Sequence, residues 1–202
     1  MKSAEDLRTQ DEQYSARLLT KESAWWKRLL DVQAPYRWNL RRLNPGFTLD
    51  IGCGLGRNLA HLNGEGVGVD HNARSVEIAK SRGLRAFVTD EFQKSPFNSP
   101  GRFDSLLLAH VAEHMTESEV TALLKTYIHL VKPGGQVIII TPQESGYQSD
   151  PTHVQFMDFE CLRRVVQESG LVPVKEYSFP FPRAFGRLFK YNEFVSVSKK
   201  QD

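Results

Sequence analysis

The sequence predicts an α/β fold built on a doubly wound sheet of seven strands, in which strands and helices alternate from residue 47 onward. Three observations support this prediction. An apolar segment runs directly into a glycine-rich turn at residues 49–56, as at the start of a mononucleotide-binding unit. A second apolar segment ends in an acid about 20 residues after the first acid, the spacing of such a unit. A continuous apolar run at residues 103–109 is typical of a strand buried on both faces.

The segment before the core has a helical pattern, in which leucines and tryptophans are interleaved with charges and Pro35 interrupts the run. We therefore expect an N-terminal helical cap over residues 1–44 and a core domain over residues 45–202. Trp25 and Trp26 are interpreted as core residues or as a homodimer contact.

The first half of the core alternates short apolar runs that end at glycine or an acid with longer amphipathic segments. We expect strands at residues 48–52, 66–70 and 85–89, and helices at residues 57–62 and 73–82.

The second half begins with the apolar strand, and its turns are marked by glycine and proline. The Lys-Pro-Gly-Gly sequence predicts a tight turn, and Gly170 separates a helix from the strand that follows. We expect, in order, a strand at 103–109, a helix at 117–131, a turn at 132–135, a strand at 136–141, a helix at 159–169 and strands at 171–178 and 192–198.

The composition is that of an ordinary globular protein, with 202 residues, 40% hydrophobic residues and a net charge of +2. So small a net charge does not by itself indicate nucleic acid or an anionic membrane as a partner. No apolar run approaches the length of about 20 residues that spans a bilayer, and the first residues are polar. The two cysteines are expected to be free thiols, and we expect a cytoplasmic location.

The glycine-rich turn carries a carboxylate, Asp50, directly before Ile51 and Gly52. An anion there would repel the pyrophosphate of a dinucleotide and would favour a cationic ligand, such as one with an ammonium group. The pattern of Asp50, Gly52, Gly54 and Gly56 resembles the first motif of the class I S-adenosylmethionine-dependent methyltransferases. Residues 103–104 and 130–136 are also similar to that family. A nicotinamide-dependent reductase is the alternative.

The resemblance implies a Rossmann-like fold with an antiparallel last strand, and S-adenosylmethionine as the cofactor. Asp70, at the end of the second strand, is expected to bind the ribose hydroxyls, although it could instead cap the next helix. The resemblance places the adenine near Asp90 and the methionine part near His110. The full set of expected cofactor contacts is Asp50, Gly52, Cys53, Gly54, Asp70, His71, Asp90, Glu91, Phe92 and His110.

The expected reaction centre contains Glu113, His114 and His153, because chemistry in such sheets takes place beyond the carboxyl ends of the strands. Histidine can remove a proton from an acceptor hydroxyl, since its ordinary pKa is about 6.5. Residues 110–114 match an inverted zinc-protease motif, which requires a long helix and is rejected here. Glu113 and His114 could instead order the start of a helix, and His153 could be an inert loop residue. A resemblance to the ubiquinone-biosynthesis O-methyltransferases implies that these three residues could bind a divalent ion such as Mg²⁺.

The acceptor is expected to be a hydroxyl of a small molecule or saccharide, since no arginine–lysine stripe indicates nucleic acid. Aromatic and polar side chains before the core and after the fifth strand could line its site, or simply bury the cap. The candidates are Tyr36, Arg37, Trp38, Gln143 and Glu144. The alternatives are an N- or C-methyltransferase and a catalytically silent subunit that binds the cofactor.

Overall fold

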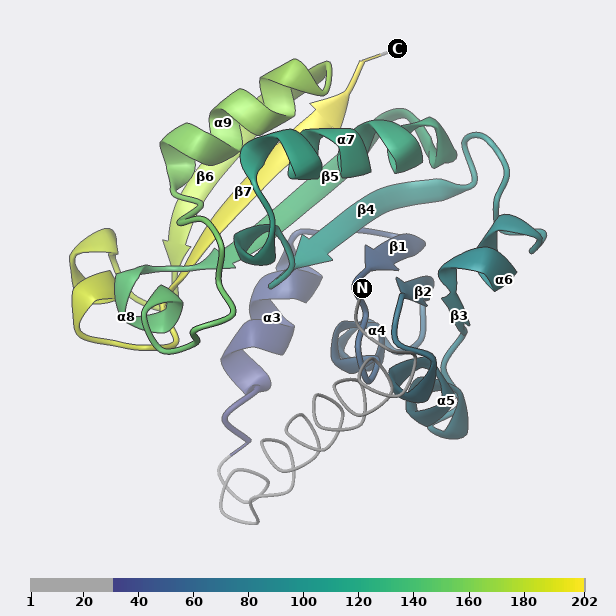
Figure 1. Ribbon diagram of the computed structural model, residues 1–202, viewed down its shortest axis with the longest axis horizontal. Coiled ribbons are helices and arrows are strands. Elements are labelled where there is room, and N and C mark those ends of the chain that lie inside the picture. The colour runs from purple at the N-terminus through teal and green to yellow at the C-terminus, as the bar shows by residue number, and fades with distance from the viewer. Residues whose placement is uncertain (1–30, 202) are drawn as a thin grey trace, which may run out of the picture.

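A computed structural model of the protein describes residues 31–201, in which seven strands form one sheet in the order β3-β2-β1-β4-β5-β7-β6 (Figure 1). The strands are β1 (Thr48–Ile51), β2 (Gly66–Asp70), β3 (Ala86–Val88), β4 (Phe103–Ala109), β5 (Val131–Pro142), β6 (Leu171–Phe179) and β7 (Glu193–Lys200). The main helices are α3 (Ala34–Arg42), α4 (Arg57–His61), α5 (Ala73–Ser81), α7 (Glu117–Tyr127) and α9 (Phe159–Glu168).

The pairing of the strands confirms the predicted topology. β3, β2, β1, β4 and β5 run parallel to their neighbours, whereas β7 is antiparallel to both β5 and β6. In this register Pro142, at the end of β5, lies opposite Glu193, the first residue of β7. The reversal of β7 therefore brings its first residue to the carboxyl edge of the parallel strands.

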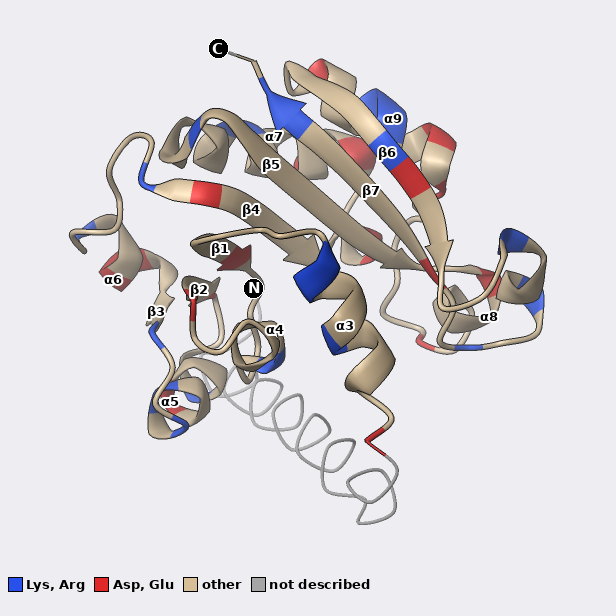
Figure 2. Ribbon diagram, turned by 180° about the vertical axis from the view of Figure 1, so that it is seen from behind, with Lys and Arg blue, Asp and Glu red and all other residues tan. Residues whose placement is uncertain are grey.

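Helices cover both faces of the sheet, as a doubly wound fold requires (Figures 1 and 2). Leu106 and Leu108 of β4 pack into the core with α7 and α9, whereas Leu107 packs on the other face with Leu40 of α3. This alternation explains the unbroken apolar run, because both faces of β4 are buried and neither face favours polar residues.

Most of the predicted N-terminal cap lies outside the described residues, including Trp25 and Trp26 and with them the expected dimer contact. Its described part contains α3, in which Pro35 occupies the first turn and so starts the helix. Leu40 of α3 is 3% exposed and belongs to the core of the sheet.

Other boundaries differ from the expected ones for local reasons. The third strand stops at Val88 because Thr89 begins an unpredicted helix, α6 (Thr89–Gln93). The helix expected at 117–131 ends at Tyr127 and continues as a 3₁₀ turn over Ile128–Leu130. The expected turn at 132–135 is an irregularity within β5, where the partner of β4 changes from Val131 to Gln136.

Three further short elements were not predicted, and all of them lie close to the carboxyl edge of the sheet. They are η1 (Ala112–His114), α8 (Glu144–Tyr147) and η3 (Arg183–Arg187). Within residues 31–201, no helix combines the length and the apolar character needed to cross a bilayer.

Candidate active site

The glycine-rich turn after β1 has the backbone conformation that its sequence requires. Gly52, Gly54 and Gly56 have φ angles of 72°, 51° and 80°, in the left-handed region that glycine adopts at little cost. A Cβ atom on Gly52 would lie 2.3 Å from Cγ2 of Val111, so this part of the turn also admits no side chain. The amides of Gly52 and Cys53 both donate to the carbonyl of Val69, which fixes the turn against the end of β2.

Asp50 is a buried carboxylate at the start of this turn, and the nearby Asn58 and Arg57 offset the effect of its burial only in part. Its side chain is 1% exposed, and within the described chain neither oxygen has a hydrogen-bond partner. Burial raises the pKa of Asp50 to about 7. A buried acid of this kind is stabilised by a cationic ligand, so its chemistry fits the ammonium group of S-adenosylmethionine.

Asp70 ends β2 opposite the glycine turn. One of its oxygens accepts a hydrogen bond from the amide of Gly54 at 2.8 Å, and the other accepts from the amide of Asn72 at 2.8 Å. The alternative role as helix cap belongs to Asn72, whose side chain accepts from Ser75 at the start of α5. Each Asp70 oxygen keeps a lone pair for a further donor, as recognition of a ribose requires. His71 is largely exposed beside it, with its Nδ1 atom 3.5 Å from Asp70.

The three residues predicted near the adenine lie in α6, but they differ in their accessibility. Asp90 is exposed, and Glu91 forms an ion pair with Lys80 at 3.0 Å. The ring of Phe92 is 1% exposed and packs against Phe87 and Tyr127 in the core. The predicted contact of Phe92 with the cofactor can therefore involve only its backbone, because its ring already has aromatic partners in the core.

His110 follows β4 with a φ angle of 59°, which is uncommon for a residue other than glycine. Its Nε2 atom lies 2.8 Å from Oε1 of Glu193, and its Nδ1 atom lies 3.4 Å from Oε1 of Glu113. Burial opposes protonation of the ring, but the hydrogen bonds to Glu113 and Glu193 outweigh it and raise the pKa of His110 to about 9. His110 is thus an imidazolium with both nitrogens occupied, which leaves no lone pair for removing a proton from an acceptor.

Glu193 is a site residue that the sequence analysis missed. The signal for it was present, because an antiparallel last strand must begin at the edge where the parallel strands end. Glu193 also affects Tyr36. The pKa of the Tyr36 phenol is raised above its ordinary value, mainly by burial and in addition by the negative charge of Glu193.

Glu113, His114 and His153 come together at the same edge, although His153 is far away in the sequence. One ligand atom from each lies within 4.8 Å of the others, and the two imidazole centroids are 4.8 Å apart. Glu113 is 1% exposed, and its Oε2 atom has no hydrogen-bond partner within the described residues. Glu113 and His114 belong to η1, before the start of α7, so residues 110–114 do not form the long helix of a zinc protease.

The imidazoles are oriented by backbone carbonyls. Nδ1 of His153 lies 2.6 Å from the carbonyl oxygen of Tyr147, and Nδ1 of His114 lies 3.2 Å from that of Thr152. A carbonyl oxygen can only accept, so each Nδ1 carries a hydrogen, and Nε2 is the nitrogen that offers a lone pair when the ring carries one proton. Such a lone pair can take up a proton or bind a metal ion.

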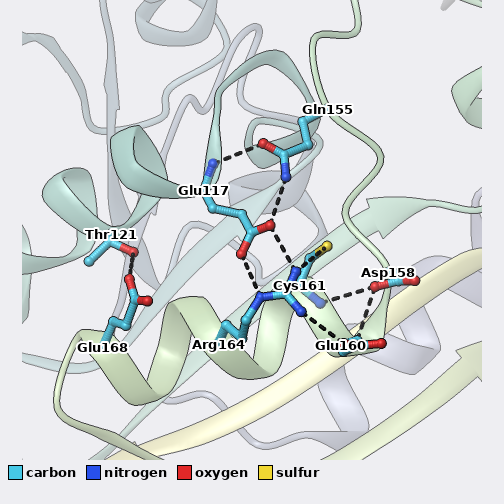
Figure 3. Close-up of polar contacts among 8 residues, drawn as sticks. All are labelled: Glu117, Thr121, Gln155, Asp158, Glu160, Cys161, Arg164 and Glu168. Carbon is cyan, nitrogen blue, oxygen red and sulfur yellow. Dashed lines mark hydrogen bonds and ion pairs between the residues drawn. The ribbon is translucent and has the colours of Figure 1, made fainter.

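A polar network holds the loop that carries His153 (Figure 3). The side chain of Gln155 accepts from the amide of Glu117 and donates to its carboxylate, which also binds Arg164 through two hydrogen bonds. The amides of Val154 and Gln155 donate to the carbonyl of Glu113. These contacts join the loop to η1, α7 and α9 and so bring His153 to His114.

The structure distributes the predicted acceptor residues between the site and its surroundings. The hydroxyl of Tyr36 donates to the carbonyl of Tyr191, while Arg37 pairs with Asp31 and Trp38 is 57% exposed. Glu144 forms an ion pair with Arg183.

Gln143 corrects another expectation. Its side chain is fully buried; its amide nitrogen donates to Ser178 and to the carbonyl of Glu193, and its oxygen accepts from Asn192. With every polar atom bonded inside the protein, Gln143 positions the start of β7 and does not face an acceptor.

The sheet order and the glycine turn between two acids are those of the class I S-adenosylmethionine-dependent methyltransferases. A family model described as a methyltransferase domain matches residues 24–176. The chain belongs to this family.

Relatives within the family differ in the acceptors that their names give. The chain is 26% identical over 137 residues to "Ubiquinone biosynthesis O-methyltransferase" of Serratia proteamaculans, a match covering 59% of this chain and 56% of that protein. It is 35% identical over 103 residues to "Probable tRNA methyltransferase 9B" of Bos taurus, a match covering 50% of this chain and 22% of that protein. The matches thus span about half, or less, of these curated relatives.

Among solved structures, N-methyltransferase NodS from Bradyrhizobium japonicum, in complex with S-adenosyl-l-homocysteine, has the same fold with a TM-score of 0.69. It is 17% identical, and the superposition covers 95% of this chain and 99% of that one. A methyltransferase from Archaeoglobus fulgidus is 20% identical with a TM-score of 0.65, covering 82% of this chain and 93% of that one.

Proposed function

We propose that the protein transfers the methyl group of S-adenosylmethionine to a hydroxyl oxygen of a small molecule or saccharide. The observation that carries this proposal is the convergence of His114, His153 and Glu113 at the edge of the sheet that also holds the glycine turn. Two imidazoles with available Nε2 lone pairs suit an acceptor that must lose a proton, as a hydroxyl does.

The cofactor is assigned to the glycine turn. Asp50 would pair with the ammonium group, and Asp70 would accept hydrogen bonds from the ribose hydroxyls. His110 and Glu193 would border the methionine end, and Asp90 would lie near the adenine. The methyl group would then point toward the histidines, where an acceptor oxygen can attack in line with the leaving sulfur.

His153 is the proposed base. Its Nδ1 atom is held by the carbonyl of Tyr147, and its ring stacks on that of Tyr147 with centroids 5.2 Å apart. These contacts fix the direction of Nε2, which would receive the hydroxyl proton as the carbon–oxygen bond forms. His114 and Glu113 would complete the polar wall that faces the acceptor.

The same three residues could hold a divalent ion. Glu113 would contribute a carboxylate oxygen, and His114 and His153 their Nε2 atoms; when bound, the ion would polarise an acceptor hydroxyl. Two imidazoles and one carboxylate fit Mn²⁺ or Zn²⁺ better than Mg²⁺, which prefers oxygen ligands. The proposal thus has a metal-free form, with His153 as the base, and a metal-assisted form. The metal-free form requires only groups that the chain itself supplies.

The test is methyl transfer from labelled S-adenosylmethionine to panels of hydroxylated sugars and phenols, with amines and tRNA as competing classes, after chelation and with Mg²⁺, Mn²⁺ or Zn²⁺ added. We expect turnover of a hydroxyl acceptor that falls by about a hundredfold in His153→Gln, since general base catalysis contributes at least that much. Cofactor affinity should be unchanged in this variant. Turnover only of amines or tRNA would overturn the assignment to a hydroxyl.

A further inference from the structure

The connection between β6 and β7 exposes apolar side chains that the proposed reaction does not use. We call residues 180–192, which include η3, the η3 loop. Leu188 is 82% exposed, Tyr191 56%, Phe185 46% and Phe181 44%. These four residues account for half of the large apolar side chains that are exposed in residues 31–201. Such clustering on a surface indicates an interaction site.

The charges of the η3 loop all have one sign. It contains Arg183, Arg187 and Lys190 and no aspartate or glutamate, in a chain whose net charge is only +2. Arg183 is anchored to Glu144 on α8, whereas Arg187 and Lys190 are exposed between the apolar side chains. In Figure 2 this loop carries Lys and Arg beside α8 at one end of the sheet.

Internal contacts hold the η3 loop in shape. The side chain of Asn192 accepts from the amide of Phe181 and donates to its carbonyl and to the buried Gln143. The rings of Phe181 and Phe189 pack edge to face with centroids 5.1 Å apart. The outward direction of Leu188 and Phe185 is therefore set by a folded loop, and little ordering is required when a partner binds.

We propose that the η3 loop docks on an anionic lipid surface, with Leu188 and Phe185 entering the apolar boundary and Arg187 and Lys190 contacting lipid phosphates. Apolar side chains flanked by cations are the composition of segments that lie in a membrane interface. Leu188, the most exposed of these side chains, is aliphatic, and the Phe181 ring packs against Phe185 and Phe189. Both features favour lipid over RNA, whose bases would stack on free aromatic faces. This docking is independent of the proposed acceptor, although the loop contacts Glu144 of α8 through Arg183.

The test is cosedimentation of the full chain with vesicles of phosphatidylcholine alone and of phosphatidylcholine mixed with phosphatidylglycerol, without cofactor or acceptor. We expect binding to the anionic vesicles that weakens with added salt. Leu188→Glu should reduce this binding by at least about tenfold, because a leucine side chain that would enter the lipid is replaced by a negative charge that the anionic lipid repels. Arg187→Gln and Lys190→Gln should each reduce it by about fivefold.

Val174→Glu is the matched control, since Val174 is 56% exposed on β6 outside the η3 loop. It should bind vesicles as the wild type does, and all variants should retain their affinity for S-adenosylhomocysteine, which verifies their folding. Absence of binding to anionic vesicles, or equal binding by Leu188→Glu, would overturn the proposal. The proposal would also be overturned if tRNA displaced the wild type from the vesicles and bound more weakly to Leu188→Glu, because the loop would then be an RNA-binding surface.

Discussion

At the scale of single residues, Asp50 links the cofactor site to pH. Its pKa of about 7 means that much of the unliganded protein carries a proton on this buried carboxyl below neutrality. Binding of a cationic ammonium group requires the ionised form. We therefore predict that the affinity for S-adenosylmethionine rises by up to about tenfold per pH unit as pH increases toward 7, and levels off above it.

Isothermal titration across this pH range measures the effect. In Asp50→Asn the affinity should be lower and should not change over the same interval. A wild-type affinity that does not vary between about pH 5 and pH 8 would show that Asp50 does not pair with the cofactor.

His61 provides a second pH effect, on stability. Burial first, and then the neighbouring arginines, lower the pKa of His61 to about 4. Because the folded pKa lies below the ordinary value of about 6.5, the unfolded chain binds the extra proton first, and stability is lost as pH falls from about 6.5 to about 4. His61→Phe should remove this loss. The difference in free energy of unfolding between His61→Phe and wild type should therefore shift in favour of the variant by up to about 3 kcal/mol from pH 7 to pH 4.

Urea unfolding of both proteins at the two pH values tests this prediction. Asp50 acts in the opposite sense, since its raised pKa gives stability below about pH 4 that is lost as pH rises through about 7. The comparison must therefore be made between wild type and variant, and parallel pH profiles of the two would contradict the role of His61.

The site residues that the sequence could predict are those whose expected role depends on the local chain. Gly52 and Asp50 follow from one turn, and His114 from the end of a strand. The side chains of Gln143 and Phe92 were expected to face ligands but are buried, because burial depends on residues distant in sequence. Gln143 bonds to Asn192 and Ser178, and the ring of Phe92 packs against Tyr127.

At the scale of elements, the loop between β5 and α9 depends on Arg164. Arg164 binds Glu117, and Glu117 binds Gln155 of the loop (Figure 3). We predict that Arg164→Ala lowers kcat by about tenfold through misplacement of His153, while the affinity for S-adenosylhomocysteine is retained. The cost in stability should stay at or below about 1 kcal/mol, since the pair is exposed.

Arg163→Ala is the matched control, because Arg163 is the adjacent residue of α9 and pairs with Glu176 on β6, away from the loop. Its kcat should equal that of the wild type. Equal losses of kcat in both variants would mean that α9 as a whole, and not the contact to the loop, supports turnover.

The elements predicted correctly are those with a strong pattern over several residues, such as β4 and α9. The short elements were missed for the opposite reason: α6 and α8 have five and four residues, too few to display a helical period. Their positions are set by the ends of β3 and β5, so the tertiary structure and not the local sequence determines them.

At the scale of the whole molecule, the reversal of one strand assembles the site. β7 runs against β5, and its first residue therefore joins the carboxyl edge where Asp50, Asp70 and His110 already lie. The sequence predicted the seven strands, and the resemblance to the family implied the reversal. Together they did not identify Glu193, because its pairing with His110 joins residues that are 83 positions apart.

The most direct test of the cofactor assignment is calorimetric titration of the protein with S-adenosylhomocysteine, for wild type and Asp70→Ala. We predict micromolar binding by the wild type and a loss of at least about tenfold in Asp70→Ala, since the acid that ends β2 would hold the ribose. An absence of binding to the wild type, or binding of NADH in its place, would contradict the assignment of the glycine turn to S-adenosylmethionine.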